Sequence, residues 1–125
     1  MNKISVLILS ASLLAAPAAF AEGDAKQGQR VFNKCKACHS LVEGQKRIGP
    51  SLYAVFGRKV GTLPGFSFSS AMKNADVVWT EKTLDEYLAK PREFMPGTRM
   101  AFAGLPKKQE RDDLIAYLKE ATKPK

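Results

Sequence analysis

Apolar side chains recur at helical spacing soon after residue 22. Asp24 is placed to cap a helix that runs to Lys34, and Gly28, Val31 and Phe32 fall on one face of that helix. This stretch predicts a short amphipathic helix with one buried side.

A second helical pattern lies in the third quarter of the chain. Thr80 is placed to cap a helix over 81–90, and Pro91 is expected to stop it. The apolar stripe of this helix consists of Leu84, Tyr87 and Leu88.

A third helical pattern occupies the C-terminal end. Pro106 is expected to open a helix that continues to about Thr122. Its buried side is expected to consist of Leu114, Ile115, Tyr117 and Leu118. A further short helix is predicted over 70–74.

Long irregular stretches separate these helices. The segments 41–68 and 92–105 are interrupted by glycine and proline and show neither helical nor strand periodicity. Loops of this length are uncommon in so small a domain unless they surround something. The pattern therefore predicts an all-α fold of three to five helices, with long loops wrapped around a group that the sequence does not encode.

The N-terminus has the pattern of a signal peptide. A basic start at Lys3 is followed by an apolar run, 4–20, and Ala19-Phe20-Ala21 offers a small-x-small cleavage site. An uncleaved membrane anchor is the alternative, but the run is short for a span and contains Pro17. We expect residues 1–21 to be a cleaved leader, residues 22–125 to form one domain in the periplasm, and no other segment to span a membrane.

The net charge narrows the choice of partners. The chain carries 20 Lys and Arg against 12 Asp and Glu, a formal charge of +8, and loss of Lys3 with the leader leaves +7. Such a charge favours acidic partners. Export argues against nucleic acid, so acidic protein surfaces are the expected partners.

The candidate chemistry is concentrated in five residues, Cys35-Lys36-Ala37-Cys38-His39. They include both cysteines and the single histidine of the chain. C-x-x-C-H is the pattern of c-type haem attachment, in which two thiols bond to the haem vinyl groups and the histidine ligates the iron. An ordinary disulfide, a thioredoxin-like redox pair and half of a zinc site are the alternatives. The redox pair lacks a βαβ context, and zinc lacks two further ligands.

The second axial ligand of such an iron must be something other than histidine. Methionine is the usual partner in cytochromes c. Met72, Met95 and Met100 remain once Met1 leaves with the leader. Met72 falls in a predicted helix and is the weakest of the three. Spacing alone does not separate Met95 from Met100.

The mature chain closely resembles class I cytochromes c, a family that includes mitochondrial cytochrome c and bacterial cytochrome c2. Beyond the haem motif, the matching segments are Gly49-Pro50, Phe56-Gly57-Arg58-Lys59, Pro64-Gly65-Phe66, Trp79, Leu84-x-x-Tyr87-Leu88, Pro96-Gly97-Thr98-Arg99-Met100-x-Phe102-Ala103-Gly104 and Asp113–Leu118. The resemblance implies a small cytochrome c fold around one covalently bound haem. It also implies that Gly28 and Phe32 pack against Leu114 and Tyr117 where the terminal helices cross.

The resemblance also assigns roles around the iron. It makes Met100 the sixth ligand opposite His39, puts an ordinary apolar residue at Met95, and makes the carbonyl of Pro50 the acceptor for the imidazole N–H. Residues implied to surround the haem are Arg58 and Trp79 at a propionate, and Tyr87 and Thr98 near the methionine sulfur. The chain departs from the family at Phe68, which replaces a propionate-binding tyrosine, and at Met72, where many members have asparagine.

The function implied is electron transfer without enzymatic chemistry. The resemblance implies a monomeric carrier between a bc1-type complex and a terminal oxidase or photosynthetic reaction centre. The docking residues it implies are Lys34, Arg47, Arg92, Arg99 and Lys107. A haem enzyme or gas sensor and a thiol–disulfide oxidoreductase are the alternatives. The former lacks a second histidine to act as an acid or base.

Overall fold

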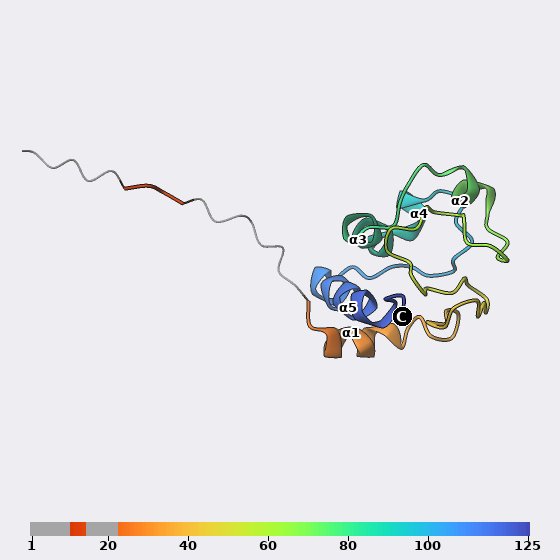
Figure 1. Cartoon of the computed structure of the whole chain (residues 1–125). Helices are drawn as coiled ribbons and strands as arrows, with labels where there is room; N and C mark the ends of the chain where they lie inside the picture. Colours follow the sequence, from red (N-terminus) through yellow and green to blue (C-terminus); the bar gives the residue numbers. More distant parts are fainter. Residues whose placement is uncertain (1–10, 15–22) are drawn as a thin grey trace, which may run out of the picture.

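The computed structural model describes residues 11–14 and 23–125. The helices in this part of the chain are α1 (Ala25–Phe32), α2 (Ser70–Asn74), α3 (Glu81–Ala89), α4 (Pro91–Phe94) and α5 (Lys108–Ala121). The only β pairing among these residues is an isolated bridge between Lys59 and Val78. The predicted all-α fold with long loops is confirmed (Figure 1).

The predicted leader, residues 1–21, lies almost entirely outside the described residues, so its cleavage stays a prediction. Over the part of the chain that the structure describes, no helix is both long enough and apolar enough to cross a membrane.

The two predicted N-caps are both present. The Asp24 carboxylate accepts hydrogen bonds from the backbone N–H of Lys26 at 2.8 Å and of Gln27 at 3.3 Å. Thr80 forms a reciprocal capping box with Thr83 at the start of α3. These bonds satisfy backbone donors that have no partner within the helix, which explains where α1 and α3 begin.

Several helix boundaries differ from the predictions, and α3 ends at Ala89 rather than at residue 90. α1 ends at Phe32 rather than Lys34, and the backbone continues as turns. Pro91 stops α3 as predicted but also opens α4, because its fixed φ suits the first position of a helix. Part of the predicted 92–105 loop is therefore helical. α5 begins at Lys108 rather than Pro106, and the carbonyls of Leu105 and Pro106 accept hydrogen bonds from a side chain of α5.

The two terminal helices lie against each other, as the resemblance implied (Figure 1). A Cβ at Gly28 would lie 1.9 Å from the backbone oxygen of Asp113 and 2.7 Å from Cβ of Tyr117, so only glycine permits this approach. Phe32 packs its ring 5.5 Å from that of Tyr117, and Leu114 is buried beside them. The crossing anchors the end of α1, from which the cysteine–histidine motif begins.

The 41–68 loop is anchored in the core rather than lying on the surface. Val55 and Val60 are buried, and Val60 donates its N–H to the carbonyl of Val77 at 2.8 Å. Gly57 donates to the carbonyl of Trp79 at 2.8 Å, and Trp79 donates to that of Arg58 at 2.9 Å. These bonds join the loop to the segment that leads into α3.

Candidate functional site

The cysteine–histidine motif forms a compact turn at the end of α1. The N–H groups of Cys38 and His39 both donate to the carbonyl of Cys35, at 3.0 and 2.9 Å. Both cysteines are free and partly buried. The turn therefore presents two thiols and an imidazole from one short segment.

Burial keeps the first of these thiols protonated. Desolvation raises the pKa of Cys35, the nearby Cys38 raises it further, and Lys34 opposes the shift only in part. A thiol–disulfide oxidoreductase needs a thiolate with a lowered pKa. The environment of Cys35 thus disfavours that alternative.

The imidazole of His39 is held in one orientation. Its Nδ1 lies 2.8 Å from the carbonyl oxygen of Pro50, which can only accept, so Nδ1 carries the proton and Nε2 keeps its lone pair. Burial is the largest cause of a lowered His39 pKa; the bond to Pro50 opposes it, and Arg58 adds to it. A neutral, oriented imidazole with a free Nε2 is the form that ligates a metal.

Gly49 is a functional residue that sequence reasoning did not single out on its own. A Cβ at this position would lie 2.5 Å from Cε1 and 2.8 Å from Nδ1 of His39. The backbone at Gly49 therefore forms a wall of the imidazole's site. Gly49 was noticed only as part of the Gly49-Pro50 match, and nothing local in the sequence indicates the contact.

Arg58 and Trp79, from different segments, are brought together by the backbone bond described above. Arg58 donates from one terminal nitrogen, Nη2, to the carbonyl of Ser51 at 3.0 Å. Its other terminal nitrogen, Nη1, is buried without a hydrogen-bond partner among the described residues. Burial lowers the pKa of this guanidinium. A buried cationic donor of this kind fits a carboxylate such as a haem propionate, which would offset the cost of burial.

A hydrogen-bonded group surrounds the sulfur of Met100. The Tyr87 hydroxyl lies 2.8 Å from Oγ1 of Thr98 and 3.9 Å from Sδ of Met100, and the Met100 N–H donates to Thr98 Oγ1 at 3.4 Å. Burial raises the pKa of Tyr87, against an opposing effect of the bond to Thr98, so the hydroxyl keeps its proton and can donate. The structure thus brings Tyr87 and Thr98 to the Met100 sulfur, as the resemblance implied.

The other two methionines have the surroundings of packing residues. Met95 is 6% exposed and belongs to the hydrophobic core. Met72 lies in α2 and packs against the same core. Neither has a polar group at its sulfur that the structure records, whereas Met100 does. At the other departure from the family pattern, Phe68 makes an edge-to-face contact with Phe66 at 4.8 Å.

The five predicted docking residues are all exposed. Lys34 pairs with Glu110 at 3.4 Å, Arg47 donates to the carbonyl of Lys36 at 2.8 Å, and Arg99 donates to that of Ser67 at 2.9 Å. Arg92 lies in α4, and Lys107 immediately precedes α5.

The zinc alternative gains no support from the tertiary structure. Among the residues that the structure describes, no three His, Cys, Asp or Glu side chains form a group that could hold a metal ion. The donor set that remains consists of two thiols, one imidazole and one thioether, which suits a covalently attached haem.

Comparison with known proteins gives the same result. The family model for cytochrome c matches residues 25–122. Cytochrome c of Sesamum indicum is 52% identical over 102 residues, which span 80% of this chain and 92% of the relative, and cytochrome c type-1 of Ascaris suum is 48% identical over 103 residues, spanning 82% and 92%. The solved structure of cytochrome cH from Methylobacterium extorquens superposes with a TM-score of 0.74 at 40% identity, covering 78% of this chain and 99% of that one. The chain therefore belongs to the cytochrome c family, whose members carry covalently attached haem c and transfer electrons.

Proposed function

We propose that this chain is a monomeric periplasmic electron carrier whose haem iron is held between His39 and Met100. It would accept electrons from a bc1-type complex and deliver them to a terminal oxidase or photosynthetic reaction centre. The haem supplies an iron that gains and loses one electron. The chain's own residues attach the haem, orient both ligands and exclude water.

One observation carries the ligation proposal. The two candidate ligands are the ones with a polar partner: the Pro50 carbonyl bonds Nδ1 of His39 and leaves its Nε2 free, and the Tyr87 hydroxyl lies 3.9 Å from the Met100 sulfur. Outer partners of this kind hold ligands in place and tune the metal. If His39 and Met100 both bind a haem iron, that iron would have no position left for a substrate, which favours electron transfer over catalysis.

The absorption spectrum of the purified protein tests this ligation. Wild type should give a c-type pyridine haemochrome and, when oxidised, a far-red sulfur-to-iron band. Met100→Ala should lose the band. Met95→Ala, the matched control, should keep it and lower only the stability. Loss of the band in Met95→Ala together with its retention in Met100→Ala would reverse the assignment.

Export is supported by the signal-peptide pattern. In a bacterial host that matures c-type cytochromes, the protein should be recovered from the periplasm. Its intact mass should equal that of a chain starting at Glu22 plus one haem. A chain that keeps residues 1–21 and stays with the membrane fraction would contradict the proposal.

Docking on acidic partners is supported by the net charge of the mature chain and by the exposure of the five cationic residues. Electrostatic steering raises association rates by about 10-fold to 1000-fold and weakens with salt. The rate of electron transfer with an isolated bc1-type complex should therefore fall as ionic strength rises. A rate independent of salt would exclude steering.

A further inference from the structure

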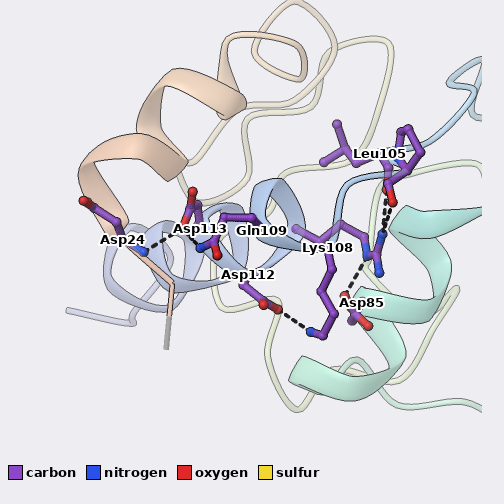
Figure 2. Close-up of polar contacts among 9 residues, drawn as sticks. Asp24, Asp85, Leu105, Lys108, Gln109, Asp112 and Asp113 are labelled. Carbon is purple, nitrogen blue, oxygen red and sulfur yellow. Dashed lines mark hydrogen bonds and ion pairs between the residues drawn. The ribbon is translucent and has the colours of Figure 1, made fainter. Parts of the chain in front are cut away.

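Polar contacts made from the first two turns of α5 include bonds to Asp85 in α3 and to Leu105, which follows Met100 in the chain (Figure 2). The central residue of these contacts is Arg111, whose side chain is 11% exposed. Nε of Arg111 donates to Oδ1 of Asp85 in α3 at 2.7 Å. Nη1 donates to the carbonyls of Leu105 at 2.8 Å and Pro106 at 3.1 Å.

These bonds fix the end of the Met100 segment. Leu105 is 1% exposed, and its N–H donates to the carbonyl of Leu88 in α3 at 2.7 Å. The carbonyl of Leu105 accepts a hydrogen bond from Arg111. Both backbone groups of Leu105 are therefore held, one by α3 and the other by α5.

Between Met100 and Leu105 the backbone has no regular structure. One local bond, from the Phe102 N–H to the Met100 carbonyl at 2.9 Å, is recorded within it. Each residue of this segment has two backbone dihedrals that can rotate. The Met100 side chain therefore stays in place only if the ends of the segment are fixed. The fixed end at Leu105 and Pro106 thus limits how far the Met100 sulfur can move.

The carboxylate of Asp85 orients the guanidinium of Arg111. A carboxylate that pairs with Nε holds the planar guanidinium in one orientation, and charge-assisted bonds of this kind are among the stronger ones in proteins. The pair is only partly exposed, at 11% for Arg111 and 28% for Asp85, so solvent screens it less than a surface pair.

We propose that Arg111, oriented by Asp85, is a positioning residue that keeps Met100 at the iron. The inference rests on the proposed ligation by Met100 and assigns a residue outside the haem site that maintains it. If the hydrogen bonds from Arg111 to the carbonyls of Leu105 and Pro106 are lost, the Met100 thioether should leave the iron more often, and other ligands could then bind in its place.

Added imidazole measures this opening directly, because its apparent affinity for the oxidised protein scales with the fraction of molecules in the open form. Asp85→Asn, which keeps the shape and removes the charge, and Arg111→Lys, which loses the fork of donors, should each bind imidazole about 10-fold more tightly than wild type. Asp112→Asn is the matched control. It breaks the exposed pair between Lys108 and Asp112 on the same helix and should leave the affinity unchanged.

A second control separates positioning from general stability. Asp113 lies two residues from Arg111, and its Oδ1 accepts bonds from the N–H of Asp24, the N-cap of α1, at 2.8 Å and from Gln109 at 2.9 Å (Figure 2). Asp113→Ala should lower the free energy of unfolding while leaving imidazole affinity as in wild type.

Equal imidazole affinities in wild type, Asp85→Asn and Arg111→Lys would overturn the inference, as would an increase in Asp113→Ala that matches theirs. If Met100 is not an iron ligand at all, the result would be different. Wild type itself would then lack the far-red band, before any substitution in α3 or α5 is made.

Discussion

Residues 35–50, which carry His39, and residues 95–105, which carry Met100, differ in how their backbones are held. In the His39 segment most backbone bonds join residues close in sequence: Cys38 and His39 donate to Cys35, Gly49 donates to the carbonyl of Cys38 at 2.8 Å, and Leu52 donates to that of Ser40 at 2.9 Å. The Met100 segment also has local bonds, from Thr98 to Met95 and from Phe102 to Met100. Its end at Leu105 is held by distant elements, Leu88 of α3 and Arg111 of α5, and its Met100 sulfur is contacted by Tyr87 of α3.

The difference implies that the His39 ligand is held more firmly than the Met100 ligand. A segment closed by its own hydrogen bonds and by two covalent bonds to haem keeps its geometry when distant parts of the molecule loosen. A segment that depends on long-range contacts opens at a lower free energy. We therefore expect Met100 to leave the iron before His39 does. The following substitutions perturb the two sides of the iron separately, in order of expected effect.

The largest effect is expected at the helix crossing behind the His39 segment. In Gly28→Ala the new Cβ would meet the backbone oxygen of Asp113 at 1.9 Å, so α1 and α5 must separate, at a cost of about 3 kcal/mol. Urea unfolding of the haem-loaded protein measures this loss. Gln29→Ala, at the adjacent exposed position, should change stability by less than about 0.5 kcal/mol. Equal stabilities for the two variants would contradict the close contact.

The next largest effect is expected at Gly49, whose backbone lies against the His39 imidazole. Gly49→Ala should push the His39 ring away from Pro50 and cost about 2 kcal/mol, because the new methyl group overlaps the ring. The ring protons of His39 in the NMR spectrum of the reduced protein should shift, while the far-red band stays. Ile48→Ala, whose side chain is 82% exposed, serves as the neighbouring control. If the band is lost while the His39 resonances are unmoved, the two sides are not independent.

On the Met100 side, Tyr87→Phe keeps the buried ring and removes the hydroxyl. The loss of its bonds to Thr98 and to the Met100 sulfur should cost about 1 kcal/mol. The reduction potential should fall, because a thioether without a donor gives more electron density to ferric iron. Redox titration measures the change. Tyr53→Phe, which removes a partly exposed hydroxyl bonded to the Lys125 N–H, should leave the potential unchanged.

The smallest effect on stability is expected at the surface. Lys34→Ala breaks the ion pair with Glu110, whose side chains are 52% and 32% exposed, and should cost less than about 0.5 kcal/mol. If Lys34 docks acidic partners, this variant should still react more slowly at low ionic strength. Glu110→Gln breaks the same pair but leaves the lysine, so its reaction should be no slower than that of wild type. Equal slowing in both variants would remove Lys34 from the docking surface.

Local signals in the sequence were enough for several of these features. Asp24 and Thr80 cap the helices that they were expected to cap, and the stripe of Leu84, Tyr87 and Leu88 is buried. The haem-attachment motif can be recognised without any distant residue, because both cysteines and the histidine lie within five positions. Such features depend on neighbours in sequence, which is why periodicity and spacing suffice to predict them.

The tertiary structure decided the features that depend on distant residues. Spacing left Met95 and Met100 equivalent, and in the folded chain Met95 is buried in the core while Met100 lies beside a tyrosine hydroxyl, as the resemblance implied. The backbone bond between Trp79 and Arg58, the contact of Gly49 with the His39 ring and the bond from Arg111 to Leu105 all join segments that meet only after folding. Their physical basis is shape and the satisfaction of buried polar groups, which a linear pattern does not encode.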